Sequence, residues 1–221
     1  MNTVINPNIL GINYAWFFQD FPKNPVIIYD SLKKINKFNG LQVSTTFQGI
    51  DIPNDFPNEM PLYQLISDNI NVKISRARLD LSFKFIHNLN IKTILEITSD
   101  VSKLIAKLRN IIRIGVFSDM FVDSSEISPI NFFENKFIRK NIIKNPYEIN
   151  FKYNIRDFFQ QKELNKIFSF DKVSNFNINN EQKDGILIRK DINSVVTNEI
   201  LSIDFILDFI TEFSEKVIDF K

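Results

Sequence analysis

The sequence predicts an α+β protein in which a mostly antiparallel sheet, or two related sheets, is packed by about three amphipathic helices. Strand-like and helical segments alternate along the 221 residues, 44% of the residues are apolar, and each half of the chain ends in a long helical pattern. A chain of this size and apolar content can close a hydrophobic core. The expected halves are residues 1–118 and 119–221, packed as one compact unit. A structural duplication would explain the shared order, although no residue-level repeat supports it.

The first half is expected to begin with a strand and a helix. Residues 9–18 are aromatic and β-prone, which favours a strand. Asn24 stands at an N-cap position, Pro25 at the first helical position and Gly40 just past the end. The segment between Pro25 and Gly40 therefore predicts a helix.

Sheet is expected in the middle of this half. Residues 41–48 and 62–66 indicate strands separated by a loop with three prolines. The apolar residues of 70–85 change parity near Ser75 and Arg76. Because side chains alternate faces along a strand, this change predicts one long strand with a bulge or bend.

An amphipathic helix and a short strand are expected to complete the first half. Apolar residues recur at helical spacing over 94–111, and residues 111–117 form an apolar strand pattern. Lys103, Lys107 and Arg109 lie mainly opposite the apolar stripe, so the exposed face of this helix is basic.

The second half is expected to repeat the order of strands and then helix. Residues 149–155 alternate apolar and polar side chains, which predicts a half-buried strand. Residues 168–173 and 185–189 predict two further strands on either side of a polar loop at 179–184.

The last helix is expected to start at Ser202, a typical N-cap residue. Its apolar stripe runs from Ile203 to Val217, and Asp204, Asp208 and Glu212 follow one another at four-residue spacing. Such carboxylates can bind divalent cations in helical bundles, but the matching acids come from facing helices. No second acidic helix is evident, so a solvated acidic face is expected.

Composition argues against several chemistries. The chain has no cysteine, which excludes disulfides, thiolate nucleophiles and cysteine-based metal sites. His87 is the single histidine, so no histidine metal cluster can form within one chain. The five glycines are isolated from one another, unlike those of phosphate-binding loops. No metal and no cofactor is therefore expected.

Charge and residue preference set the expected context. The formal net charge is +1, so no global charge marks a nucleic-acid or membrane partner. The start of the chain has no leader pattern, and no run of about 18 apolar residues occurs, which predicts a soluble, cytoplasmic protein. The preference for Ile, Asn, Lys and Phe is typical of AT-rich bacterial or phage genomes, including their mobile elements.

A non-enzymatic protein-interaction or adaptor role is the main functional expectation, as a homo-oligomer or a subunit of a larger complex. Few catalytic side chain types are present, whereas surplus aromatic residues can supply the apolar centre of an interface. The partner would be another protein or a second copy of the chain. Candidate anchors are Phe56, Met60, Tyr63, Phe132 and Phe133.

A nucleic-acid-binding module in residues 136–156 is the first alternative. Six basic residues and one acidic residue, Glu148, give this segment a charge of +5, and aromatic residues interleave with them. Against this alternative, Phe151 and Tyr153 share the parity expected for the core face. The candidate nucleic-acid-binding residues are Lys136, Arg139, Lys140, Lys144, Lys152 and Arg156.

A hydrolase or RNase that relies on His87 is the second alternative. This histidine is expected where a strand runs into a loop, a position at which catalytic residues occur. An ordinary histidine at the edge of a loop explains the same observation more simply.

Overall fold

The computed structural model of the 221-residue chain describes residues 7–22, 24–46, 52–84, 90–137, 148–178 and 180–219. A turn of 3-10 helix, Asn36–Phe38, follows the first α-helix. In chain order the strands and α-helices are β1 (Asn8–Phe18), α1 (Val26–Leu32), β2 (Gln42–Thr45), β3 (Tyr63–Ile66), β4 (Ile70–Ile74), β5 (Arg78–Lys84), α2 (Ile91–Leu108), β6 (Ile111–Asp123), α3 (Pro129–Lys136), β7 (Asn150–Phe159), β8 (Lys162–Ile178), β9 (Glu181–Ser194) and α4 (Ile203–Ile218).

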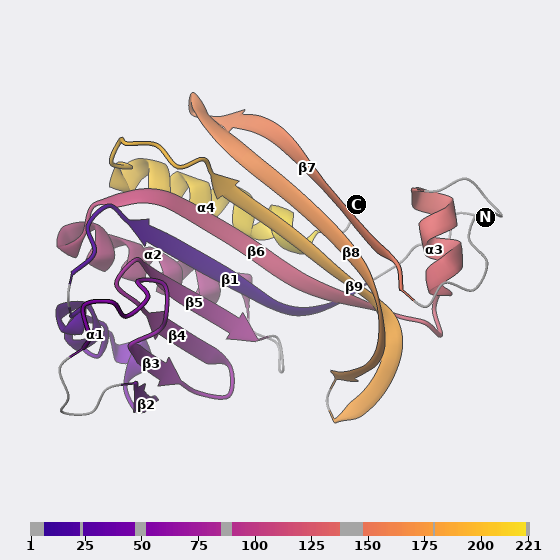
Figure 1. Cartoon of the computed structure of the whole chain (residues 1–221), viewed down its shortest axis with the longest axis horizontal. Coiled ribbons are helices and arrows are strands. Elements are labelled where there is room, and N and C mark those ends of the chain that lie inside the picture. Colours follow the sequence, from indigo (N-terminus) through magenta and orange to yellow (C-terminus); the bar gives the residue numbers. More distant parts are fainter. Residues whose placement is uncertain are drawn as a thin grey trace.

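The described strands form one nine-stranded sheet with the order β2-β3-β4-β5-β1-β6-β9-β8-β7. Each neighbouring pair is antiparallel. The expected α+β class is confirmed, with a single sheet that is large relative to its helices (Figure 1).

The two halves of the chain extend to opposite sides of the central β1–β6 pair (Figure 1). After β1 the chain crosses to the outer strand β2 and returns through β3 and β4 to β5, which pairs with β1. After β6 it crosses to the outer strand β7 and returns through β8 to β9, which pairs with β6. The long helices α2 and α4 follow these two returns. A common origin of the halves and a division at residue 118 stay predictions.

Alternating side chains give the sheet one buried face. Ile12, Tyr14 and Trp16 of β1 are fully buried and belong to the main core, which α1, α2 and α4 help to form. A second cluster surrounds Phe132 and Phe133 of α3 and includes strand residues of the same side. We call this side of the sheet the helix side (Figure 1).

Two buried hydrogen bonds attach the long helices to β1. The Tyr14 hydroxyl lies 2.8 Å from Ser214 Oγ of α4, and Trp16 Nε1 donates to Ser102 Oγ of α2 over 3.1 Å. Burial raises the pKa of Tyr14, so this phenol stays protonated and keeps its hydrogen bond. The polar tips of both rings are thereby satisfied inside the core.

The expected single bent strand over residues 70–85 is wrong. β4 and β5 are separate strands that pair with each other as a hairpin. Ser75 forms the turn, because its Oγ accepts from the backbone N–H of Arg78 over 3.0 Å. The change of parity therefore marks a turn between two strands that both bury residues on the helix side.

Other boundaries differ in length from the expected ones. β6 continues to Asp123, and β8 and β9 extend to Ile178 and Glu181, so most of the expected loop at 179–184 is strand. α1 ends at Leu32, well before Gly40. Ser202 is confirmed as an N-cap, since its Oγ accepts from the N–H of Phe205 over 3.2 Å. Within the described residues no helix is long and apolar enough to cross a membrane.

Candidate binding face

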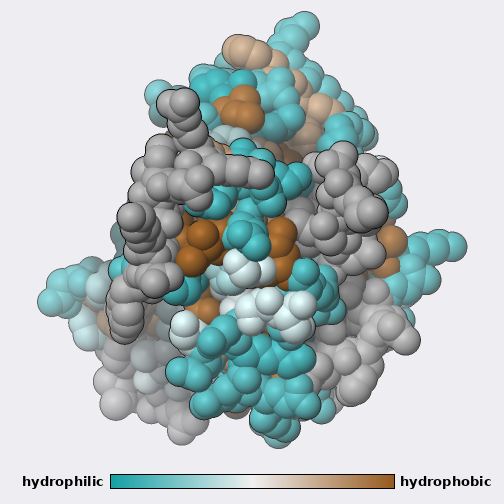
Figure 2. Space-filling view, turned by 90° about the vertical axis from the view of Figure 1, so that its right-hand side faces the viewer, coloured by the Kyte–Doolittle hydropathy of each residue, from teal (hydrophilic) through white to brown (hydrophobic). Residues whose placement is uncertain are grey.

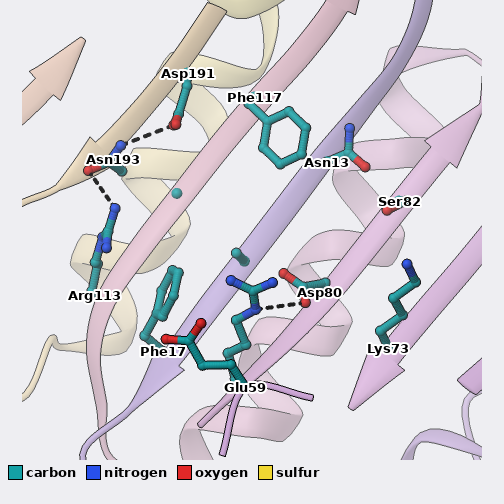
Figure 3. Close-up of a pocket in the computed structure, with 13 residues that line it drawn as sticks. Asn13, Phe17, Glu59, Lys73, Asp80, Ser82, Arg113, Phe117, Asp191 and Asn193 are labelled. Carbon is teal, nitrogen blue, oxygen red and sulfur yellow. Dashed lines mark hydrogen bonds and ion pairs between the residues drawn. The ribbon is translucent and has the colours of Figure 1, made fainter. Parts of the chain in front are cut away.

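The side of the sheet opposite the helices carries alternating polar and aromatic residues. We call this surface the open face. On β1 it presents Asn13, Ala15 and Phe17, which alternate with the core residues Ile12, Tyr14 and Trp16 of the same strand. No described helix packs its buried residues there, and the helices lie behind the sheet when this face is viewed from the front (Figure 3).

A pocket of about 520 Å³ lies at the centre of the open face, over β4, β5, β1, β6 and β9 (Figure 3). Ala15 and Gly115 form part of its lining, and they stand directly opposite each other in the β1–β6 register. Neither residue projects beyond a methyl group, so the two form a low floor between the larger lining side chains, and both are themselves buried. A Cβ added to Gly115 would lie 3.2 Å from Asn193 Cβ, so the floor is closely packed against this neighbouring lining residue.

Two phenylalanine rings flank this floor. Each phenylalanine comes two residues after the floor residue of the same strand. Phe17 follows Ala15 in β1, and Phe117 follows Gly115 in β6. Guanidinium groups lie over both rings: that of Arg113 is 4.6 Å from the centre of the Phe17 ring, and that of Arg189 is 4.9 Å from the Phe117 ring. These cation–π contacts keep each guanidinium group against an aromatic ring of the open face.

The pocket contains equal numbers of positive and negative side chains. Arg78 Nε donates to Asp80 Oδ2 over 3.0 Å, which forms an ion pair beside the Phe17 ring. Burial raises the pKa of Asp80, and the neighbouring Arg78 opposes that shift. The charged lining residues are Lys73, Arg78 and Arg113 on the positive side and Glu59, Asp80 and Asp191 on the negative side.

Arg113 keeps hydrogen-bonding capacity within this pocket. Its Nη2 donates to Asn193 Oδ1 over 3.0 Å, and Asn193 in turn donates to Asp191 over 3.0 Å. Arg113 Nε is buried and has no hydrogen-bond partner among the described residues. Burial also lowers the pKa of Arg113, although an arginine remains charged at physiological pH. The guanidinium is therefore positioned by contacts that leave part of its donor set unused.

This arrangement is suited to binding. Donors, acceptors and aromatic surface converge on one shallow site, which is the usual composition of a recognition surface. Among the pocket residues, Ser82 carries the hydroxyl group, and no histidine or cysteine accompanies it. Within the described part of the chain, no group of three or more His, Cys, Asp or Glu side chains could hold a metal ion.

The structure places the five candidate anchors in different environments. Phe132 and Phe133 are 0% exposed in the α3 cluster, so the interpretation of this pair as exposed anchors is wrong: the apolar face of α3 packs on the sheet. Tyr63 lies in β3, stacks on Tyr29 at 4.9 Å and donates to Asn24 over 2.7 Å. Met60 is 50% exposed and Phe56 is partly buried. Of the five candidates, Met60 is the most exposed.

The described members of the basic segment do not share one surface. Lys152 and Arg156 alternate along β7 with Phe151 and Tyr153, which lie on the helix side. Lys136 ends α3, whose packing is on that helix side. Arg156 is paired with Glu163 over 3.1 Å. Nucleic-acid binding by this segment stays a prediction, as do the roles of Arg139, Lys140, Lys144 and His87, which lie outside the described residues.

Sequence reasoning missed the central residues of the open face. Phe17, Phe117 and Arg113 come from strands whose pairing joins positions about a hundred residues apart. The local signal was present in β1, where Asn13, Ala15 and Phe17 alternate with core residues. No protein-family model matches the chain, and no curated protein is similar enough in sequence to count as a relative.

Proposed function

We propose that the chain is a non-enzymatic interaction protein and that its protein partner docks on the open face of the sheet. The observation that carries this proposal is the central pocket, where Phe17 and Phe117 flank a floor of Ala15 and Gly115. A projecting side chain of a partner can enter this hollow between the two rings. Interface centres are enriched in aromatic residues and arginine, as this site is.

The balance of charge favours a protein over a nucleic acid as the partner. Three basic and three acidic side chains line the pocket, and Arg189 is bound to Asp119 through two hydrogen bonds of 2.6 and 2.9 Å. A phosphate backbone requires an excess of positive charge, since counterion release supplies most of its affinity. A protein surface can instead offer both signs of charge, which fixes the register of docking.

The partner would therefore present charges of both signs around an apolar or aromatic side chain. Arg78 and Arg113 would face its carboxylates, and Asp80 and Asp191 its basic groups. An adaptor role in a larger assembly is consistent with this geometry, since one side of the sheet holds the fold together and the other is available for contact.

The test is capture of partners by a variant in which the pocket is filled. In Ala15→Trp an indole would occupy the space above the floor while the core residues of β1 remain unchanged. Tagged wild-type protein, Ala15→Trp and the surface control Lys103→Glu on α2 would be used with a nuclease-treated lysate of producing cells, and bound proteins would be quantified by mass spectrometry. Far-ultraviolet circular dichroism would establish that each variant is folded.

We expect a protein that binds wild type and Lys103→Glu but is depleted by Ala15→Trp and by a second variant, Arg113→Glu. Reconstitution with that purified protein should reproduce the difference. Equal capture by all four chains would contradict the proposal. In a parallel capture from untreated lysate, binding that is present there but absent after nuclease treatment would indicate nucleic acid as the ligand of the face and would also contradict the proposal.

A further inference from the structure

Within the described residues, β7 is an outer strand of the sheet and has no strand paired to its outer side. It spans ten residues, Asn150–Phe159, and pairs on one side with β8 in an unbroken register. The opposite edge of the sheet, β2, has only four residues. Sheet edges are usually blunted by short strands, prolines or bulges, because their unpaired backbone groups can pair with another strand. β7 contains no proline, and its pairing shows no bulge.

β7 also exposes apolar side chains on both of its faces. Ile155 is 48% exposed and lies on the helix side, whereas Phe158 is 69% exposed and lies on the side of the open face. Figure 2, which views the molecule from the right-hand side of Figure 1, shows hydrophobic surface toward the top of the molecule among hydrophilic residues. An edge strand of this length with exposed apolar residues is suited to pairing with another strand.

We propose that β7 pairs with β7 of a second copy of the chain, antiparallel, with Ile155 on the two-fold axis. A two-fold axis perpendicular to a sheet relates antiparallel edge strands and keeps equivalent faces on the same side. Residues opposite each other then have the same parity, so the axis passes through a single residue position. Few such positions exist within β7, and they can be compared by the side chains that they bring together.

The register centred on Ile155 is the favourable one. It places Ile155 opposite itself and Phe151 opposite Phe159, which covers apolar side chains on the helix side. On the other side it places Lys152 opposite Phe158 and Asn154 opposite Arg156. Aromatic and aliphatic pairs stabilise paired strands, and a lysine beside a phenylalanine ring adds a cation–π contact.

The neighbouring registers bring like charges together. Centring on Asn154 places Lys152 opposite Arg156, and centring on Arg156 places that guanidinium opposite itself. Like charges directly opposite on paired strands are destabilising. Centring on Tyr153 leaves Phe158 and Phe159 beyond the paired residues. Charge repulsion and apolar contact together therefore favour the alignment centred on Ile155.

This second surface is independent of the partner proposed for the pocket. The pocket lies over β4, β5, β1, β6 and β9, whereas β7 forms the outer edge on the far side of β8. In the dimer both open faces would point to the same side, because the axis is perpendicular to the sheet. Two pockets on one side would permit bivalent binding to a partner with two matching sites.

Single-cysteine cross-linking tests both the contact and its register, because the natural chain has no cysteine. In Ile155→Cys the two thiols would face each other across the axis, within the span of a disulfide. In the control Asn154→Cys the two Cα atoms would be offset by two residues, about 8 Å apart, which exceeds that span. Val196→Cys, at a position that is 56% exposed and lies after β9, on the other side of β8 from β7, reports random collisions.

Mild oxidation should convert Ile155→Cys to a covalent dimer while the two controls stay monomeric. Sedimentation velocity should show a concentration-dependent dimer of the wild type, weakened about tenfold in Ile155→Lys by the loss of the apolar pair and the repulsion across the axis. A wild-type chain that stays monomeric at high concentration would overturn the proposal. Any strand that pairs with β7 would then belong to another protein. Cross-linking of Asn154→Cys at an equal rate would overturn the register.

Discussion

Arg76 shows how a single side chain organises a long stretch of loop. It is 4% exposed, and its guanidinium donates to the backbone carbonyls of Pro53 at 2.9 Å, Phe56 at 3.0 Å and Asn54 at 3.4 Å. The turn between β4 and β5 thereby holds the proline-containing loop against the sheet. Glu59, which lines the central pocket, belongs to this loop.

Replacing Arg76 with methionine should destabilise the protein by about 2–4 kcal/mol, because three backbone carbonyl groups of the loop would lose a charged donor. Chemical denaturation of wild type and variant measures this difference. The matched control is Arg78→Met, since Arg78 is partly exposed and its ion pair with Asp80 should contribute about 1 kcal/mol or less. Equal losses in both variants would show that Arg76 does not organise the loop.

At the scale of elements, local sequence signals predicted the presence of strands and helix caps better than they predicted the lengths of the elements. Ser202 was predictable because an N-cap depends on its own helix turn. The full length of β8 was not predictable in this way. Its register with β9 shifts between Val173 and Phe176, and Asn175 has a positive φ of 54°. This bulge interrupts the alternation that sequence reasoning uses, and it accompanies the curved end of the hairpin (Figure 1).

The curved end of the hairpin depends on the absence of a side chain at Gly185. A Cβ there would lie 2.2 Å from the carbonyl oxygen of Val122 and 2.4 Å from the ring of Phe121. Phe121 is fully buried and stacks on Phe176 at 5.5 Å, so the ring has little room to move. β9 can therefore approach β6 this closely only with glycine at this position.

Gly185→Ala should lower the free energy of unfolding by about 2–4 kcal/mol through this overlap. Gly115→Ala is the matched control in the adjacent strand. The nearest atom to its added Cβ would be Asn193 Cβ at 3.2 Å, so its cost should stay below about 1 kcal/mol. Urea denaturation of both variants provides the comparison. A larger loss in Gly115→Ala than in Gly185→Ala would contradict the packing described for the hairpin.

At the scale of the whole molecule, the sequence predicted the class of fold but could not predict which side chains would meet. The apolar stripe of α4 indicated a core face, whereas the pocket required the register that sets Ala15 opposite Gly115. Phenylalanine illustrates the same limit: Phe132 and Phe133 looked like surface anchors and are buried, while Phe17 and Phe117 lie on the open face. Long-range strand pairing decides these outcomes, and it leaves no local pattern in the sequence.

The central claim is that one side of the sheet holds the fold and the other is open to a partner. Thiol labelling tests it most directly, because each introduced cysteine is the only one in the chain. Ser82→Cys lines the pocket on the open face, whereas Ser102→Cys lies fully buried on the core side of α2. Under native conditions Ser82→Cys should react with a maleimide as rapidly as an exposed control, Val196→Cys, and Ser102→Cys only after unfolding. Protection of Ser82→Cys to the extent of Ser102→Cys in the free protein would contradict the claim.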